Sequence, residues 1–180
     1  TFNFVTGQRE KEYTNLNLDP NTIVIIEGIH ALNGMIADYF PEAFKLYISA
    51  RSDVEFNGEI MFKRTWFRLM RRMVRDRRTR ATGAIQTMDM WDKVREGEEK
   101  YIFPYQEKAD VMFNSALIFE FAVLKRHAEP ILQEVPKYCE EYSEAHRLLK
   151  FLQYFVPIPE KEIPPTSLLR EFVGGSSFHY

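Results

Sequence analysis

The chain concentrates its arginines in one stretch. Residues 63–80 hold nine basic side chains and a single acid, Asp76, so this stretch carries 9 − 1 = +8 and the rest of the chain −10. Arginine offers planar, bidentate donors that suit phosphate oxygens, so this pattern indicates polyphosphate binding and charge stabilisation during phosphoryl transfer. A solvated charged face and an RNA- or DNA-binding face stay open as alternatives, but no other basic segment extends the patch.

A single acid follows the most apolar run of the sequence. Thr22–Ile26 is β-branched throughout, and Glu27 and Gly28 come directly after it. Such a run predicts a strand that is buried on both faces of a parallel sheet, where ligands bind at the carboxyl ends of strands. Glu27 is therefore a candidate for holding Mg²⁺ beside a phosphate. The alternative is a strand-end acid that faces solvent.

Aromatic residues near the start of the chain form a third candidate site. Phe2 and Phe4 have flat apolar side chains that could stack on a nucleobase, although core packing is the better expectation for at least one of them. The four histidines show no metal-ligand spacing, and the single cysteine, Cys139, excludes an internal disulfide.

The elements that position these residues alternate between strands and helices. We predict strands at 22–27, 44–49 and 109–113, and helices at 29–40, 62–80, 91–108, 116–134, 140–155 and 167–172. Residues 50–61 and 81–90 are expected to be irregular. The alternation predicts an α/β fold with a parallel sheet in three layers.

The overall composition is that of a globular domain. The chain has 180 residues, 45% of them hydrophobic and 28% charged, with no apolar run of the roughly 20 residues that span a membrane. The lone cysteine fits a reducing, cytoplasmic compartment. The first residue is Thr1 and not Met, which fits a fragment, a processed product or an engineered segment.

Four segments, taken in order, resemble the uridine kinase branch of the phosphoribulokinase/uridine kinase family of P-loop kinases. They are Phe2-Asn3-Phe4-Val5, Ile23-Val24-Ile25-Ile26-Glu27-Gly28-Ile29, Arg68-Leu69-Met70-Arg71-Arg72-Met73-Val74-Arg75-Asp76 and Ala109-Asp110-Val111. The resemblance covers roughly residues 1–133. It implies a C-terminal part of the kinase domain over residues 1–136 and a helical, proline-containing extension over 137–180.

The resemblance also implies roles for individual residues. Such kinases transfer the γ-phosphate of ATP to a nucleoside 5′-hydroxyl with Mg²⁺. Glu27 would lie near the magnesium ion, and Arg72, Arg75 and Arg80 would be lid arginines that bind the phosphates. Phe2 and Phe4 would line the nucleoside pocket, which Arg72 also reaches, with uridine or cytidine as the favoured substrate.

One family motif is absent from these 180 residues. The phosphate-binding loop, Gly-x-x-x-x-Gly-Lys-Ser/Thr, occurs nowhere in them, and neither does the segment that carries the family's catalytic aspartate. We therefore expect the sheet to be incomplete, with its N-terminal strands missing. A preceding kinase segment or a partner chain would supply them. An inactive kinase-like module that binds RNA or another polyanion through residues 63–80 is the alternative.

Overall fold

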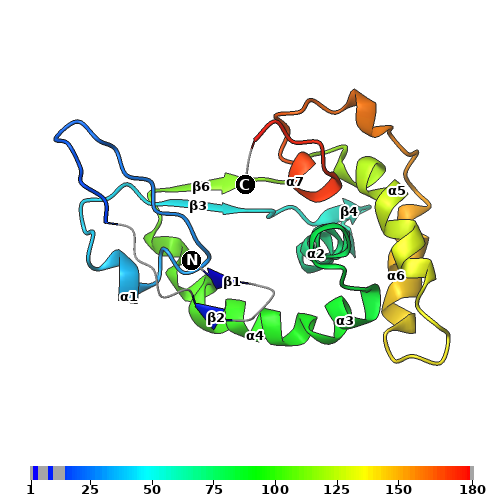
Figure 1. Cartoon of the computed structure of the whole chain (residues 1–180). Coiled ribbons are helices and arrows are strands. Elements are labelled where there is room, and N and C mark those ends of the chain that lie inside the picture. Colours follow the sequence, from blue (N-terminus) through cyan, green and yellow to red (C-terminus); the bar gives the residue numbers. More distant parts are fainter. Residues whose placement is uncertain (1, 4–7, 10–14, 179–180) are drawn as a thin grey trace.

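The computed structural model of the chain describes residues 2–3, 8–9 and 15–178. These residues form an α/β arrangement of short strands and longer helices (Figure 1). The strands are β1 (Phe2–Asn3), β2 (Gln8–Arg9), β3 (Leu46–Ser49), β4 (Val54–Phe56), β5 (Glu59–Phe62) and β6 (Val111–Asn114). The helices are α1 (Gly34–Ala37), α2 (Arg64–Arg80), α3 (Ala84–Asp89), α4 (Trp91–Tyr101), α5 (Glu120–Gln133), α6 (Tyr142–Leu152) and α7 (Arg170–Val173), with 3-10 turns at Phe103–Lys108 and Glu160–Glu162.

The predicted parallel pairing is confirmed for two strands. β3 and β6 run parallel and side by side, with Leu46 opposite Val111 and Ser49 opposite Asn114 (Figure 1). Side chains fix this register at both ends, because Asp110 accepts a hydrogen bond from the Lys45 amide at 2.7 Å and Asn114 accepts one from the Arg51 amide at 3.0 Å. β6 begins two residues later than the sequence predicts.

The prediction of a buried strand at 22–27 is wrong. This segment makes no strand in the structure, and Ile23 and Ile25 are 88% and 86% exposed. In the described part of the chain no strand pairs with it, so its amide and carbonyl groups form no ladder and its apolar side chains have no sheet to pack into. The β-branched run indicates strand propensity but does not create a pairing partner.

Two segments predicted as irregular are ordered. Residues 50–61 include an antiparallel hairpin, in which Asn57 and Gly58 form the turn with φ values of 52° and 81°. Asn-Gly is the strongest short hairpin signal, so this element was predictable. Residues 81–90 contain α3, whose first turn is closed by Thr87 donating to the Gly83 carbonyl at 3.1 Å.

The helix predicted at 29–40 is much shorter than expected. Only α1 is helical, and Asn33 caps it by accepting a hydrogen bond from the Met35 amide at 3.0 Å. The other predicted helices are confirmed with shifted ends, and residues 91–108 divide near Pro104 into α4 and a 3-10 turn.

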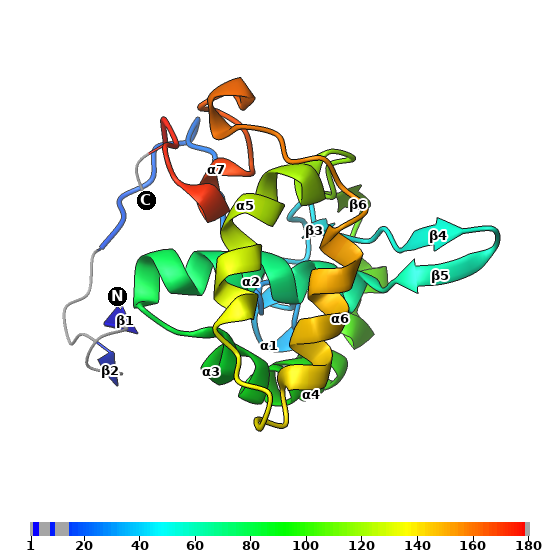
Figure 2. The same ribbon diagram turned by 90° about the vertical axis from the view of Figure 1, so that its right-hand side faces the viewer.

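The hydrophobic core lies between helices rather than on the sheet. In Figure 2, α2, α5 and α6 pack together while the β4–β5 hairpin projects from the body. Phe62 stacks on Phe151 of α6 with ring centroids 3.8 Å apart, and Phe121 of α5 packs edge-on against both. α6 and α7 therefore share a core with α2 and α5, and the boundary at 136 stays a prediction. Among the described residues, no helix is long and apolar enough to cross a membrane.

Candidate functional site

α2 is the element that positions the candidate site. Its sequence contains no Gly or Pro, and it buries Phe67, Met70 and Met73 against the core. The helix ends where Ala81 adopts a left-handed conformation with φ 51°, and the amide of Thr82 then donates to the Asp76 carbonyl at 3.2 Å. This hydrogen bond closes the last turn of α2.

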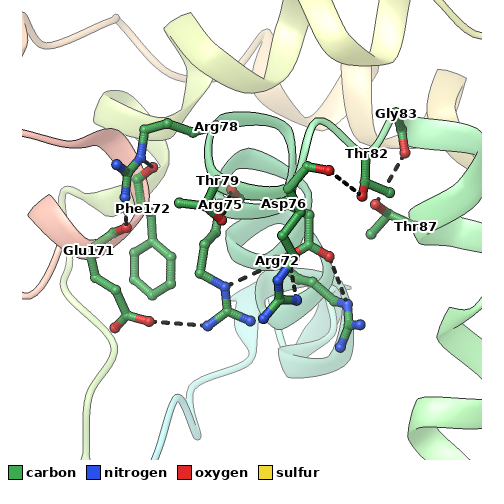
Figure 3. Close-up of polar contacts among 11 residues, drawn as sticks. Arg72, Arg75, Asp76, Arg78, Thr79, Thr82, Gly83, Thr87, Glu171 and Phe172 are labelled. Atoms are coloured by element: carbon green, nitrogen blue, oxygen red, sulfur yellow. Dashed lines mark hydrogen bonds and ion pairs between the residues drawn. The ribbon is translucent and has the colours of Figure 1, made fainter. Parts of the chain in front are cut away.

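The three arginines predicted to bind phosphate gather around one buried carboxylate. Figure 3 shows two of them, Arg72 and Arg75, beside Asp76. Asp76 is 1% exposed. Arg80 Nη1 donates to Asp76 Oδ1 at 2.9 Å, Arg72 Nε lies 3.2 Å from Oδ2, and Arg75 Nε lies 3.8 Å from Oδ1. The spacing explains the grouping, because positions four residues before and after Asp76 lie on the same helix face. We call Arg72, Arg75, Arg80 and Asp76 the arginine cluster.

The arginine cluster has the properties of an anion site. Its arginine side chains are 24%, 32% and 38% exposed, so they remain accessible while Asp76 below them is not. Three cations around one anion leave a net charge of +2. A preorganised group of guanidinium donors with this charge can bind phosphate oxygens and stabilise charge that develops in phosphoryl transfer.

Two arginines of the stretch at 63–80 do not take part in this candidate anion site. Arg71 is 8% exposed and points into the core, where it forms a bidentate ion pair with Glu120 of α5. It also donates to the Ser115 carbonyl at 2.7 Å. Arg68 pairs with Glu98 of α4. These two arginines join helices and do not belong to the arginine cluster.

Glu120 is the group whose titration the fold changes most clearly. It is fully buried, and this burial raises its pKa above the ordinary 4.5, while the Arg71 guanidinium and the Leu117 amide oppose that shift. The ion pair thus stands in surroundings that disfavour charge.

The positive charge of residues 63–80 is partly balanced inside the protein. Other helices supply carboxylates to α2 that are distant in the sequence. Besides Glu98 and Glu120, Glu134 accepts from Arg77 at 2.7 Å and Glu171 accepts from Arg75 at 3.1 Å. These four acids balance half of the +8, and part of the remaining positive charge lies on the partly exposed arginine cluster.

The C-terminal segment reaches the candidate site, which the sequence did not predict. α7 packs on α2, and Arg78 donates to the carbonyls of Glu171 at 2.6 Å and Phe172 at 3.1 Å (Figure 3). No local sequence signal indicates this contact, because the paired residues are more than 90 positions apart.

The structure does not bring Glu27 to the arginine cluster. Glu27 is exposed and makes no hydrogen bond or ion pair within the described residues. The described ranges also contain no group of three His, Cys, Asp or Glu side chains that could hold a metal ion, so they do not form a protein cage for Mg²⁺. Phe4 and the side chain of Phe2 lie outside the described residues.

A comparison with known protein families gives a match for this sequence. The sequence model of the phosphoribulokinase / uridine kinase family matches residues 1–118, which include the whole of α2 and the β3–β6 pair. The chain therefore belongs to this family of kinases. No curated protein and no solved structure matches it. The family makes the protein a phosphotransferase of P-loop kinase type, and its members use ATP with Mg²⁺.

Proposed function

We propose that the chain is part of a uridine-kinase-like, ATP-dependent nucleoside kinase, which transfers the γ-phosphate of ATP to a nucleoside 5′-hydroxyl. The single observation that carries this proposal is the arginine cluster, an exposed group of three guanidiniums organised by buried Asp76 in a chain of a kinase family. In phosphoryl transfer the protein mainly positions the phosphates and stabilises their charge, and this is the chemistry such a cluster can perform.

The residues have the following proposed roles. Arg72, Arg75 and Arg80 bind the ATP phosphates, and Arg75 and Arg80 stabilise the charge on the transferred phosphoryl group. Mg²⁺ enters with ATP, and Glu27 helps to hold it. Phe2 and Phe4 line the nucleoside pocket with Arg72, and uridine or cytidine is the favoured substrate.

The sheet supports the proposal that a further segment completes the kinase. Leu46, Ile48, Val111 and Phe113 lie on the same face of the β3–β6 pair and are between 45% and 58% exposed. The apolar segment 22–27 is exposed as well. An apolar sheet face of this kind is normally covered. We propose that a preceding segment of the kinase or a partner chain, carrying the phosphate-binding loop, covers it.

The alternative of a polyanion-binding module has no comparable support. Arg68, Arg71 and Arg77 engage protein carboxylates, so they do not form a continuous basic surface with the arginine cluster. A cytoplasmic location stays a prediction from the single cysteine.

The test is a steady-state nucleoside kinase assay of the intact protein with Arg75→Ala. We expect turnover to fall about 100-fold or more, because a phosphate-stabilising donor acts in the transition state, while the KM for the nucleoside changes little. Arg95→Ala is the matched control, since Arg95 makes only an exposed pair with Glu99, at 3.4 Å, in the part of the chain that the structure describes. Unchanged turnover of Arg75→Ala would refute the proposed role of the cluster.

A further inference from the structure

The C-terminal helix α7 is firmly attached to α2. Leu169, Phe172 and Val173 are 0%, 6% and 7% exposed, and Arg78 holds the backbone of α7 through two hydrogen bonds. Arg170 links α7 to the residues that precede it, because its side chain donates to the carbonyls of Glu160 and Ile163 at 2.8 and 2.6 Å. The backbone of α7 therefore keeps its place whatever its exposed side chains do.

One exposed side chain of this anchored helix reaches the arginine cluster. Glu171 accepts a hydrogen bond from Arg75 Nη1 at 3.1 Å, and the two side chains are 35% and 32% exposed (Figure 3). Arg75 thus lies between two carboxylates, with Asp76 on its Nε side at 3.8 Å. Asp76 is buried and fixed, but Glu171 faces solvent and can turn away without moving α7.

The charge of Glu171 opposes the use of Arg75 as an anion donor. The arginine cluster alone has a net charge of +2, and Glu171 reduces it to +1. A phosphate that approaches Arg75 meets a carboxylate already bound to one edge of the guanidinium. Since partly exposed ion pairs contribute little stability, a multiply charged phosphate can displace this carboxylate at small cost.

We propose that Glu171 is an intramolecular competitor for phosphate at Arg75, through which the C-terminal segment tunes the affinity of the arginine cluster. This inference rests on the proposed function of the cluster. In the absence of phosphate, Glu171 occupies Arg75; when phosphate binds, the Glu171 side chain turns to solvent and Arg78 keeps α7 in place. By linkage, the Glu171–Arg75 pair weakens phosphate binding by the same factor by which bound phosphate weakens the pair.

The experiment is calorimetric titration of the chain with inorganic tripolyphosphate, before and after Glu171→Gln. The substitution removes the charge and preserves the size of the side chain. We expect the Kd to fall about three- to five-fold, in line with the strength of a partly exposed ion pair. Glu162→Gln is the matched control, because Glu162 lies in the same C-terminal segment, is exposed and pairs only with Lys161 within the described residues. It should leave the Kd unchanged.

A second comparison separates this inference from the proposed function. In an Arg75→Gln background, Glu171→Gln should no longer change the Kd, because the pair is already broken. If wild-type binding depends on Arg75 but Glu171→Gln leaves the Kd unchanged or raises it, the competitor role is refuted and the proposed function stands. If tripolyphosphate does not bind, or binds equally without Arg75, both are refuted.

Discussion

Arg71 and Arg72 are neighbours in the sequence, and the structure predicts opposite consequences for the same substitution at the two positions. Arg71→Met leaves Glu120 buried at 0% exposure without its partner. Removing one member of a buried ion pair typically costs about 3–5 kcal/mol of stability. For a chain of this size that corresponds to a fall in Tm of about 10 °C.

Arg72→Met should cost much less stability. Arg72 is one of three arginines around Asp76, and Arg75 and Arg80 remain beside that carboxylate after the substitution. We therefore expect a loss of about 1 kcal/mol or less. Because Arg72 belongs to the exposed cluster, its loss should instead weaken tripolyphosphate binding about ten-fold, the value of one charge-assisted hydrogen bond.

Two assays on the same protein samples decide the question. Urea unfolding gives the free energy of unfolding, and calorimetric titration at a temperature well below the Tm gives the Kd for tripolyphosphate. Arg71→Met should lower only the free energy of unfolding, whereas Arg72→Met should mainly raise the Kd for tripolyphosphate. If the two variants lost similar stability, or if Arg71→Met weakened binding as much as Arg72→Met does, the division of α2 into structural and anion-binding arginines would be wrong.

Two further predictions concern titration and the hairpin. Burial raises the pKa of the Glu120 carboxyl group in the folded state above 4.5, so the unfolded chain loses the proton of Glu120 at a lower pH than the folded protein does. The contribution of Glu120 to stability therefore falls as the pH rises from about 4.5 through the raised pKa. Without the opposing effect of Arg71 that pKa rises further, so urea unfolding should show Arg71→Met to be less destabilising at about pH 5 than at about pH 8; an equal loss would contradict this. Gly58→Ala should cost about 1 kcal/mol in thermal unfolding, since φ is 81° there, whereas Gly97→Ala, in the middle of α4, should not destabilise; equal effects would exclude backbone strain as the cause.

Local sequence patterns were sufficient to predict the helices that build the core. α2 was predictable because 17 residues without Gly or Pro place apolar side chains at helical spacing. β3 and β6 were predictable from short apolar runs, and their parallel pairing from the alternation of strands and helices. The individual helices and strands depend on residues that are close in the sequence.

The segment at 22–27 shows where such patterns fail. Its β-branched residues have the strongest strand propensity in the chain, yet Ile23 and Ile25 are almost fully exposed. A strand needs neighbours that accept and donate its backbone hydrogen bonds, and propensity says nothing about whether they are present. The position of Glu27 at a strand end was wrong for the same reason, since no strand forms at 22–27, while its role beside Mg²⁺ stays a prediction.

The arginines of the candidate site could be predicted from the sequence, but the carboxylates that pair with the arginines of α2 could not, because they lie far away in the sequence. Arg72, Arg75 and Arg80 were identified from their motif, and Asp76 could have been recognised as their centre because it is the single acid of the run and lies four residues from two of them. The partner carboxylates could not be assigned in this way. Glu98, Glu120 and Glu171 come from three other helices, at separations of 30, 49 and 96 residues from the arginines they pair with.

Charge counting over residues 63–80 therefore overstates the anion site. A count of +8 treats all nine bases alike, but their burial separates them into two kinds. A buried arginine must be paired inside the protein, whereas an exposed arginine can exchange its partner. Arg71, at 8% exposure with Glu120 at 0%, is of the first kind. Arg75, whose pair with Glu171 is about one third exposed, is of the second. Exposure of the pair, together with the gathering of three arginines around Asp76, thus identifies which part of α2 can exchange a protein carboxylate for a phosphate.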